Sequence, residues 1–234
     1  MDYLRLFFSK IGLLRLIRQS SLWKIKNKKL TRVFESNAVN IFKDISAIFN
    51  ANQIQVWPEF GTLLGIIRDK GFIKDDLDLD FGVFGDQVNE KEIKKLLLNN
   101  GYTPTVKCLR ILGDHKQVIS CKFIKDQIDV DIYFFYESSD RENLFLYDLE
   151  TDNGLSVNEE FDLKGKLTTF KNIFTSFSLN QYNIFDSYAL IPDNVEKHLI
   201  ELYGETYLTP DPKWHSGKRK NRYMDSNISI LAYE

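Results

Sequence analysis

The sequence predicts an α+β fold, in which helices flank a β-sheet. Segments 76–81 and 127–135 alternate acidic and apolar residues at the period of a half-buried strand. Strand-like segments follow one another between residues 103 and 149, and segments with apolar residues at helical spacing lie on both sides of them. The 234 residues, 43% of them hydrophobic and 27% charged, have the composition of a soluble globular protein. They suffice for one well-buried domain with appendages, or for two small lobes.

Residues 1–32 are predicted to form a basic amphipathic arm in front of one domain over residues 33–234. The arm carries nine Lys and Arg against one Asp, a net charge of +8, so the whole-chain charge of −2 leaves −10 for the domain. Apolar residues follow helical spacing in its first turns: Leu4, Phe7, Phe8, Ile11 and Leu14. No apolar run reaches the length of a membrane span. We therefore expect the arm to bind an anionic membrane surface, the alternative being a helix packed on the domain or on a partner subunit.

The first half of the domain is expected to contain both helices and strands. The apolar pattern predicts, in order, a helix over Val33–Phe49, a strand over Ile54–Trp57, a helix from a Gly-Thr turn to Arg68, the acidic strand Asp76–Phe81 and a helix over Asn89–Asn99. The last of these helices has a capping-box-like start, because Asn89 is followed three residues later by Glu92.

The second half is expected to be mainly β-structure, followed by a helix and a basic tail. The predicted strands lie near Thr103–Ile111, Gln117–Ile124, Gln127–Phe135 and Asn143–Leu149. Segment 150–190 is polar and has the pattern of β-structure. It is expected to form a hairpin beside the substrate cleft of the protein. A helix after Pro192 places His198 on its apolar stripe, which favours a core histidine over a metal ligand. The tail Trp214–Arg222 is basic and aromatic, so it is either solvated or holds anionic groups of a substrate.

Three carboxylates on one strand are the most informative local feature. Asp76, Asp78 and Asp80 share a face, and residues two apart in a strand lie about 6.5–7 Å apart. Carboxylates on one face repel each other and are poor strand formers, so a cation is expected to offset them. Hard oxygen ligands suit Mg²⁺ or Mn²⁺. The alternative is an exposed strand with its acidic face in water.

A second acidic strand supplies further carboxylates. In segment 127–135, Asp129 and Asp131 alternate with apolar residues. A two-metal site for phosphoryl transfer needs carboxylates from neighbouring strands around ions roughly 3.5–4 Å apart. Asp78 and Asp80 from one strand, with Asp131 from the next, would meet this need.

The Gly-Thr turn before the acidic strand has the pattern of a phosphate-binding helix start. Gly61 lets the backbone approach a ligand closely, and Thr62 would lie at a helix N-terminus, where free N–H groups bind phosphate. The alternative for Thr62 is a plain N-cap. Arg68, two turns further on, either neutralises the helix C-terminus or clamps a donor phosphate.

Together these segments resemble the signature of the LicD/fukutin family of phosphotransferases. The matching segments are Gly61–Arg68, Gly71–Ile73, the acids of Asp76–Asp80, Val130–Tyr133, and the stretch from Ile191-Pro192 through Glu201–Gly204 to Pro210. They span most of the chain. The family is part of the nucleotidyltransferase superfamily, which includes DNA polymerase beta, so the resemblance implies a nucleotidyltransferase-like mixed β-sheet flanked by helices.

The resemblance also implies roles for individual residues. Asp78 and Asp80 match the family's metal ligands and Asp131 its third carboxylate. The turn residues Gly61 and Thr62 match the phosphate side. Arg68 matches the family arginine on the donor side, and Lys74, beside the acidic run, is expected to contribute to donor binding although it does not match the family residue at its position. The chain departs from the family pattern, with Lys74-Asp75 where a Pro-Trp pair is usual and Leu77 in place of a middle acid, but the metal pair is kept.

Family members transfer phosphocholine, ribitol phosphate or a related phosphorylated alcohol from a CDP-linked donor to a glycan, with a divalent metal. The resemblance therefore implies a metal-dependent phosphotransferase acting on a cell-surface glycan, with Asp131 or Asp129 as general base. One alternative is a nucleotidyltransferase that moves NMP onto a sugar phosphate, protein or RNA. Another is a non-catalytic, membrane-associated scaffold for glycan assembly. No nucleic-acid partner is expected.

The two cysteines, Cys108 and Cys121, are interpreted as reduced residues of the core. Together with the basic arm, they predict a cytosolic protein at the inner face of the membrane.

Overall fold

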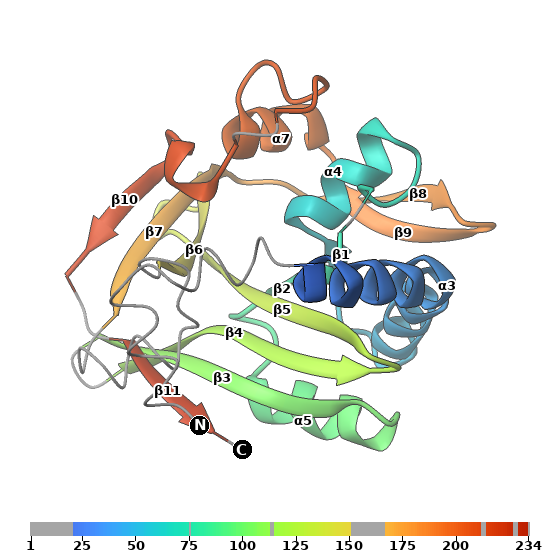
Figure 1. Cartoon of the computed structure of the whole chain (residues 1–234). Helices are drawn as coiled ribbons and strands as arrows, with labels where there is room; N and C mark the ends of the chain where they lie inside the picture. Colours follow the sequence, from blue (N-terminus) through green and yellow to red (C-terminus); the bar gives the residue numbers. More distant parts are fainter. Residues whose placement is uncertain are drawn as a thin grey trace.

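A computed structural model describes residues 21–74, 76–112, 115–150, 167–211, 214–226 and 229–233. Its fold is α+β, as the sequence predicts, with a large mixed sheet flanked by helices (Figure 1). Residues 1–20 of the predicted arm, and residues 151–166 of the predicted polar segment, lie outside the described residues.

The helices and strands follow one another in an order close to the predicted one. They are α3 (Ser21–Ala51), β1 (Val56–Pro58), α4 (Phe60–Arg68), β2 (Asp78–Phe84), α5 (Glu90–Asn99), β3 (Thr103–Leu112), β4 (His115–Lys125), β5 (Ile128–Glu137), β6 (Asn143–Glu150), β7 (Thr168–Thr175), β8 (Leu179–Ile184), β9 (Ser187–Pro192), α7 (Val195–Tyr203), the short 3-10 helix η1 (Ser216–Lys218), β10 (Arg222–Asp225) and β11 (Ser229–Tyr233).

Strand β5 is the centre of the sheet. The strands from β10 to β11 run in the order β10-β7-β6-β5-β4-β3-β11, all neighbours being antiparallel. Strand β2 pairs with β5 in parallel, and β1 pairs with β2 in the opposite direction. The β2–β5 register sets Asp78 beside Asp129 and Asp80 beside Asp131. Because side chains alternate along a strand, these carboxylates lie on one face of the sheet.

The two faces of the sheet carry different side chains. Leu79 and Phe81 of β2, together with Val130 and Ile132 of β5, join α3 and α5 in one apolar core. The opposite face carries the carboxylates and borders a second core around Trp57, which includes residues of α4, α7 and β7. The alternation recognised in the sequence therefore separates an apolar face from a polar one.

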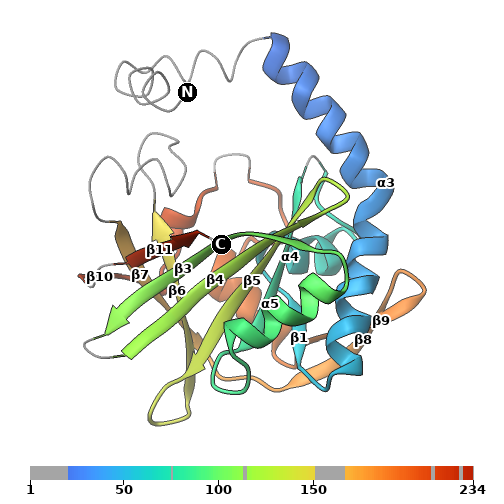
Figure 2. The same ribbon diagram turned by 90° about the horizontal axis from the view of Figure 1, so that it is seen from below.

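Helix α3 is longer than predicted. It runs without a break from Ser21 to Ala51, and Figure 2 shows that its first turns extend beyond the sheet. The boundary predicted after residue 32 thus falls inside this helix. From Phe34 onward α3 buries a regular apolar stripe against the sheet, and Lys28, Lys29 and Arg32 before it are exposed.

The segment predicted as a hairpin contains one, formed by β8 and β9. It packs against β1 and α7. The tail after residue 214 is folded rather than loose, since β10 pairs with β7 along Thr169–Asn172.

Candidate active site

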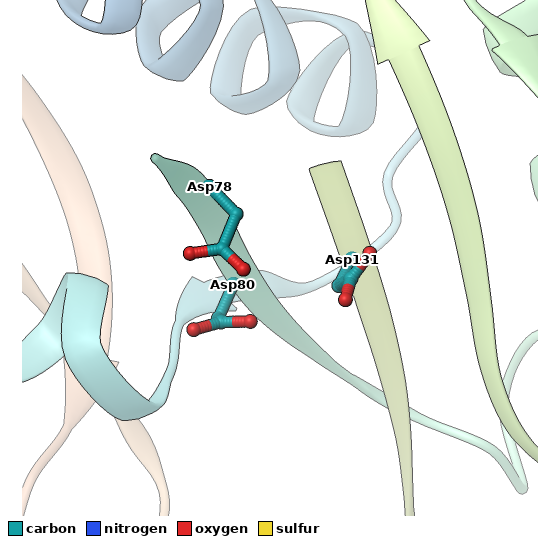
Figure 3. Close-up of side chains that lie close together, drawn as sticks. All are labelled: Asp78, Asp80 and Asp131. Carbon is teal, nitrogen blue, oxygen red and sulfur yellow. The ribbon is translucent and has the colours of Figure 1, made fainter. Parts of the chain in front are cut away.

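Three carboxylates meet where β2 and β5 lie side by side. Asp78, Asp80 and Asp131 each offer one oxygen, and these oxygens all lie within 4.8 Å of one another (Figure 3). The parallel pairing of the two strands places Asp131 level with Asp80. This spacing is close enough for the three carboxylates to bind a single cation.

Burial makes this cluster electrostatically costly. Burial is the main cause that raises the pKa of Asp80 well above its usual range, and the charges of neighbouring acids add to it. Burial also raises the pKa of Asp131 to about 6. For Asp76, burial and the charge of Asp78 raise the pKa to about 7. A divalent cation would reverse these shifts, because its charge favours the ionised carboxylates.

The bonding of Asp131 tests whether a cation fits here. One of its oxygens, Oδ2, lies 3.1 Å from Nζ of Lys122. The other, Oδ1, is buried and has no hydrogen-bond partner among the described residues. A buried acceptor without a partner costs free energy, and a metal ion at the cluster would satisfy it. The three acids therefore fit a hard divalent ion.

The cluster is held against the start of α4 by the backbone of Asp80. The Asp80 N–H donates to the hydroxyl of Thr62 at 2.9 Å, and the Glu59 N–H donates to the carbonyl oxygen of Asp80, also at 2.9 Å. Thr62 is buried. Its hydroxyl therefore positions strand β2, which carries Asp78 and Asp80, while Gly61 lies on the open side of the same turn.

A buried polar network supports this turn from behind. Oε1 of Glu59 lies 2.8 Å from Nε2 of His198, and Oε2 accepts a hydrogen bond of 2.8 Å from the Trp57 indole N–H. Both Glu59 and His198 are fully buried. The prediction that His198 is a core histidine is thus confirmed, with the addition that it links α7 to the residue before α4.

A cavity of about 700 Å³ opens in front of the acids. Five of the predicted site residues line it: Gly61, Arg68, Lys74, Asp78 and Asp80. A Cβ atom added at Gly61 would lie 3.0 Å from Oδ2 of Asp76, so the absence of a side chain lets this carboxylate approach the helix start. Arg68 forms a fork with its neighbour, Nε and Nη2 lying 2.9 and 2.8 Å from the two oxygens of Asp69.

The other predicted site residues lie behind this lining. Among the described residues, Thr62, Asp129 and Asp131 do not line the cavity. Asp131 is only 7% exposed, whereas Asp129 is partly exposed. The β8–β9 hairpin, expected beside the cleft, also contributes nothing to the described lining. The hairpin packs against β1 and α7 instead.

The C-terminal part of the chain supplies the far wall of the cavity. Its lining residues include Tyr203, Tyr207, Trp214, Ser216 and Arg219, and Asp148 of β6 lies beside them. The predicted basic and aromatic tail therefore reaches the site. The sequence singled out neither Lys122 nor Asp148 nor Glu59. Their places follow from strand register and from long-range packing, for which the strand pattern carries no signal.

The comparisons with known proteins agree with this geometry. Residues 53–179, more than half of the chain, match the family model described as LicD/FKTN/FKRP, nucleotidyltransferase domain. An uncharacterized protein of Rickettsia typhi is 28% identical over 183 residues, which cover 74% of this chain and 55% of the relative. An uncharacterized protein of Rickettsia prowazekii is 29% identical over 212 residues, which cover 82% of this chain and 71% of the relative. The chain thus spans about half the length of the first relative.

Proposed function

The chain belongs to the LicD/FKTN/FKRP nucleotidyltransferase-domain family, and from this membership we propose that it is a metal-dependent phosphotransferase. The proposed reaction moves a phosphorylated alcohol (phosphocholine, glycerol phosphate or ribitol phosphate) from a CDP-linked donor to a hydroxyl of a cell-surface glycan. The observation that carries the proposal is the Asp78, Asp80 and Asp131 cluster beside the cavity, with one buried Asp131 oxygen that has no partner among the described residues.

In this proposal the acids hold Mg²⁺ or Mn²⁺ in a two-ion arrangement. When bound, the metal neutralises phosphate charge and lowers the pKa of the acceptor hydroxyl. Gly61 presents the N-terminus of α4 to the donor pyrophosphate, with Arg68 and Lys74 on the same side. Asp131 or Asp129 accepts the proton of the acceptor hydroxyl. The resulting oxygen attacks the β-phosphorus, and CMP leaves with the bridging oxygen.

Phosphorus NMR of the purified chain with different donors tests this reaction. CDP-choline, CDP-glycerol and CDP-ribitol are each incubated with Mg²⁺ and a glycan acceptor, and nucleoside triphosphates are run in parallel. We expect CMP and a new phosphodiester from at least one CDP-linked donor. Release of pyrophosphate from a triphosphate, without CMP from any CDP-alcohol, would instead support a nucleotidyltransferase that moves NMP.

We further propose that the basic start of the chain binds an anionic membrane surface. Among the described helices none is long and apolar enough to cross a membrane. The exposed Lys28 and Lys29 lie on the first turns of α3, next to the basic residues that precede it in sequence. Each lysine near an anionic surface contributes about 1 kcal/mol to binding.

Charge removal within the full chain tests this contact without cutting α3. Substituting Lys28 and Lys29 by Gln removes about 2 kcal/mol of attraction and is expected to weaken binding to vesicles that contain phosphatidylserine by roughly 30-fold, as measured by co-sedimentation. The matched control substitutes Lys91 and Lys95, two exposed lysines of α5, and should leave binding unchanged. Equal binding of both double variants would contradict the membrane contact.

A further inference from the structure

Arg219 is the cation of the cavity wall that faces the acids. It comes from the C-terminal segment between η1 and β10, and it lines the same cavity as Asp78 and Asp80. Its side chain is only 7% exposed. The guanidinium carbon lies 4.6 Å from the centre of the Phe60 ring and 5.6 Å from that of Trp214. These aromatic contacts hold the guanidinium at the start of α4.

The hydrogen bonds of Arg219 are incomplete. Its Nη1 lies 3.3 Å from Oδ2 of Asp148, but this carboxylate also accepts from Nε of Arg222, which lies 3.2 Å from both of its oxygens. Nε of Arg219 is buried and has no partner among the described residues. A guanidinium has five N–H donors, and leaving buried donors unpaired costs free energy. An anionic group in the cavity would satisfy them.

Asp78, Asp80 and Arg219 line one common cavity. Burial raises the pKa of the Tyr133 hydroxyl well above its usual range; the charges of the three acids add to this shift, whereas Arg219 opposes it. Burial also raises the pKa of the Tyr203 hydroxyl. The charge of Arg219 opposes this shift, and the charge of Asp80 adds to it. The Phe60 ring, under the guanidinium, packs edge-on against Tyr133 at 4.8 Å. A ligand between Arg219 and the acids would therefore contact both.

We propose that Arg219 is a substrate-binding residue that holds a phosphate group of the donor from the side opposite the carboxylates. The planar fork of a guanidinium matches the oxygens of a phosphate, and a metal held by the acids would neutralise the same group from the other side. This inference rests on the proposed function, because it takes the ligand to be a pyrophosphate-containing donor. It assigns donor recognition to the C-terminal segment as well as to the turn at Gly61.

Inorganic pyrophosphate with Mg²⁺, titrated into the full chain by calorimetry, is the probe for this contact. Arg219→Gln is expected to weaken its binding by roughly 10–100-fold, the effect of losing charge-assisted hydrogen bonds. Arg219→Lys keeps the positive charge but loses the paired N–H donors of the guanidinium. Its pyrophosphate affinity should lie between those of the wild-type chain and Arg219→Gln. Lys220→Gln removes an exposed neighbouring charge that does not line the cavity, and should change binding less than threefold. Mn²⁺ affinity, measured alone, should be the same in all four proteins.

The outcomes separate this inference from the function on which it rests. Equal pyrophosphate affinity in wild type and Arg219→Gln would overturn it, as would a loss in Lys220→Gln as large as that in Arg219→Gln. If Arg219→Gln does not fold by circular dichroism, the Arg219→Lys comparison decides, and unchanged affinity there overturns the inference. A wild-type chain that binds Mn²⁺ but not pyrophosphate also overturns it and leaves the metal site intact. A chain that binds neither removes the proposed function as well.

Discussion

Replacing both Asp78 and Asp80 by Asn is expected to reduce donor turnover by at least roughly 1,000-fold, equivalent to about 4 kcal/mol of transition-state stabilisation. The physical reason is that the two residues supply two of the three clustered oxygens, and a neutral amide is a poor ligand for a hard divalent ion. The measurement is CMP release under saturating Mg²⁺.

The same double variant should be more stable than the wild-type chain in the absence of metal. When folding raises the pKa of a carboxyl group, the folded state holds its proton to a higher pH than the unfolded state does. The free energy of unfolding therefore falls as the pH rises from the pKa of the unfolded state, about 4, to the pKa of the folded state. Burial raises the pKa of Asp80 well above its usual range, and the variant removes this group. Burial also raises the folded pKa of Asp131 to about 6 and that of Asp76 to about 7, and the charge of Asp78, which the variant also removes, adds to both shifts. We therefore expect wild-type stability in a chelator to fall between pH 4 and 7, and the variant to lose roughly 1–3 kcal/mol less over that range.

A matched pair of aspartates provides the control. Asp126 and Asp186 lie at turns with φ of 52° and 54°, a backbone conformation that Asn tolerates as well as Asp. Neither lines the cavity. Substituting both by Asn should leave turnover and the pH dependence of stability as in wild type. Retained turnover in the Asp78 and Asp80 variant, with the fold intact, would remove these residues from the reaction.

Substituting His198 by Ala is expected to cost roughly 3–5 kcal/mol of unfolding free energy. Within the part of the chain that the structure describes, the change leaves the buried Glu59 carboxyl with only the Trp57 indole as side-chain partner. It also opens a hole between α7 and the aromatic cluster of Phe135, Phe174 and Phe177. Urea denaturation measures the loss as a lower midpoint at similar slope.

An exposed histidine serves as the reference for this prediction. His215 lies at the surface just before η1, and its replacement by Ala should change stability by less than about 0.5 kcal/mol. If His198→Ala costs no more than His215→Ala, the buried network does not support the turn. If it costs several kcal/mol, residual turnover in the folded fraction shows how much the network also positions Asp80, whose carbonyl accepts from the Glu59 N–H.

The strand pattern predicted the acidic face of the site because a strand has a fixed period. Alternation alone put Asp78 and Asp80 on one face, and the match at Val130–Tyr133 assigned Asp131 to the neighbouring strand; β2 and β5 have this arrangement. The α+β class and the positions of most elements up to α7 followed from the same reasoning, whereas β10 and β11 were not predicted as strands. Helix α3 was predicted too short, because the charged residues before Val33 obscure its apolar stripe.

The remaining parts of the site depend on the register between paired strands and on contacts between residues far apart in the sequence. A local hydrophobic pattern encodes neither. Lys122 reaches Asp131 because β4 pairs with β5 in one particular register. Glu59 meets His198 across 139 residues of sequence, and Arg219 reaches Asp148 across 71. The basic and aromatic composition of the tail was visible, yet only the pairing of β10 with β7 shows that it forms a wall of the cavity.

A Mn²⁺ titration of the full chain by calorimetry at pH 7.5 tests the central claim, that Asp78, Asp80 and Asp131 form a divalent-metal site. We expect saturable binding in the wild-type chain, no detectable binding when Asp78 and Asp80 are both Asn, and wild-type binding when Asp126 and Asp186 are both Asn. A flat wild-type titration, or equal binding in the first variant, would contradict it and would favour a non-catalytic scaffold.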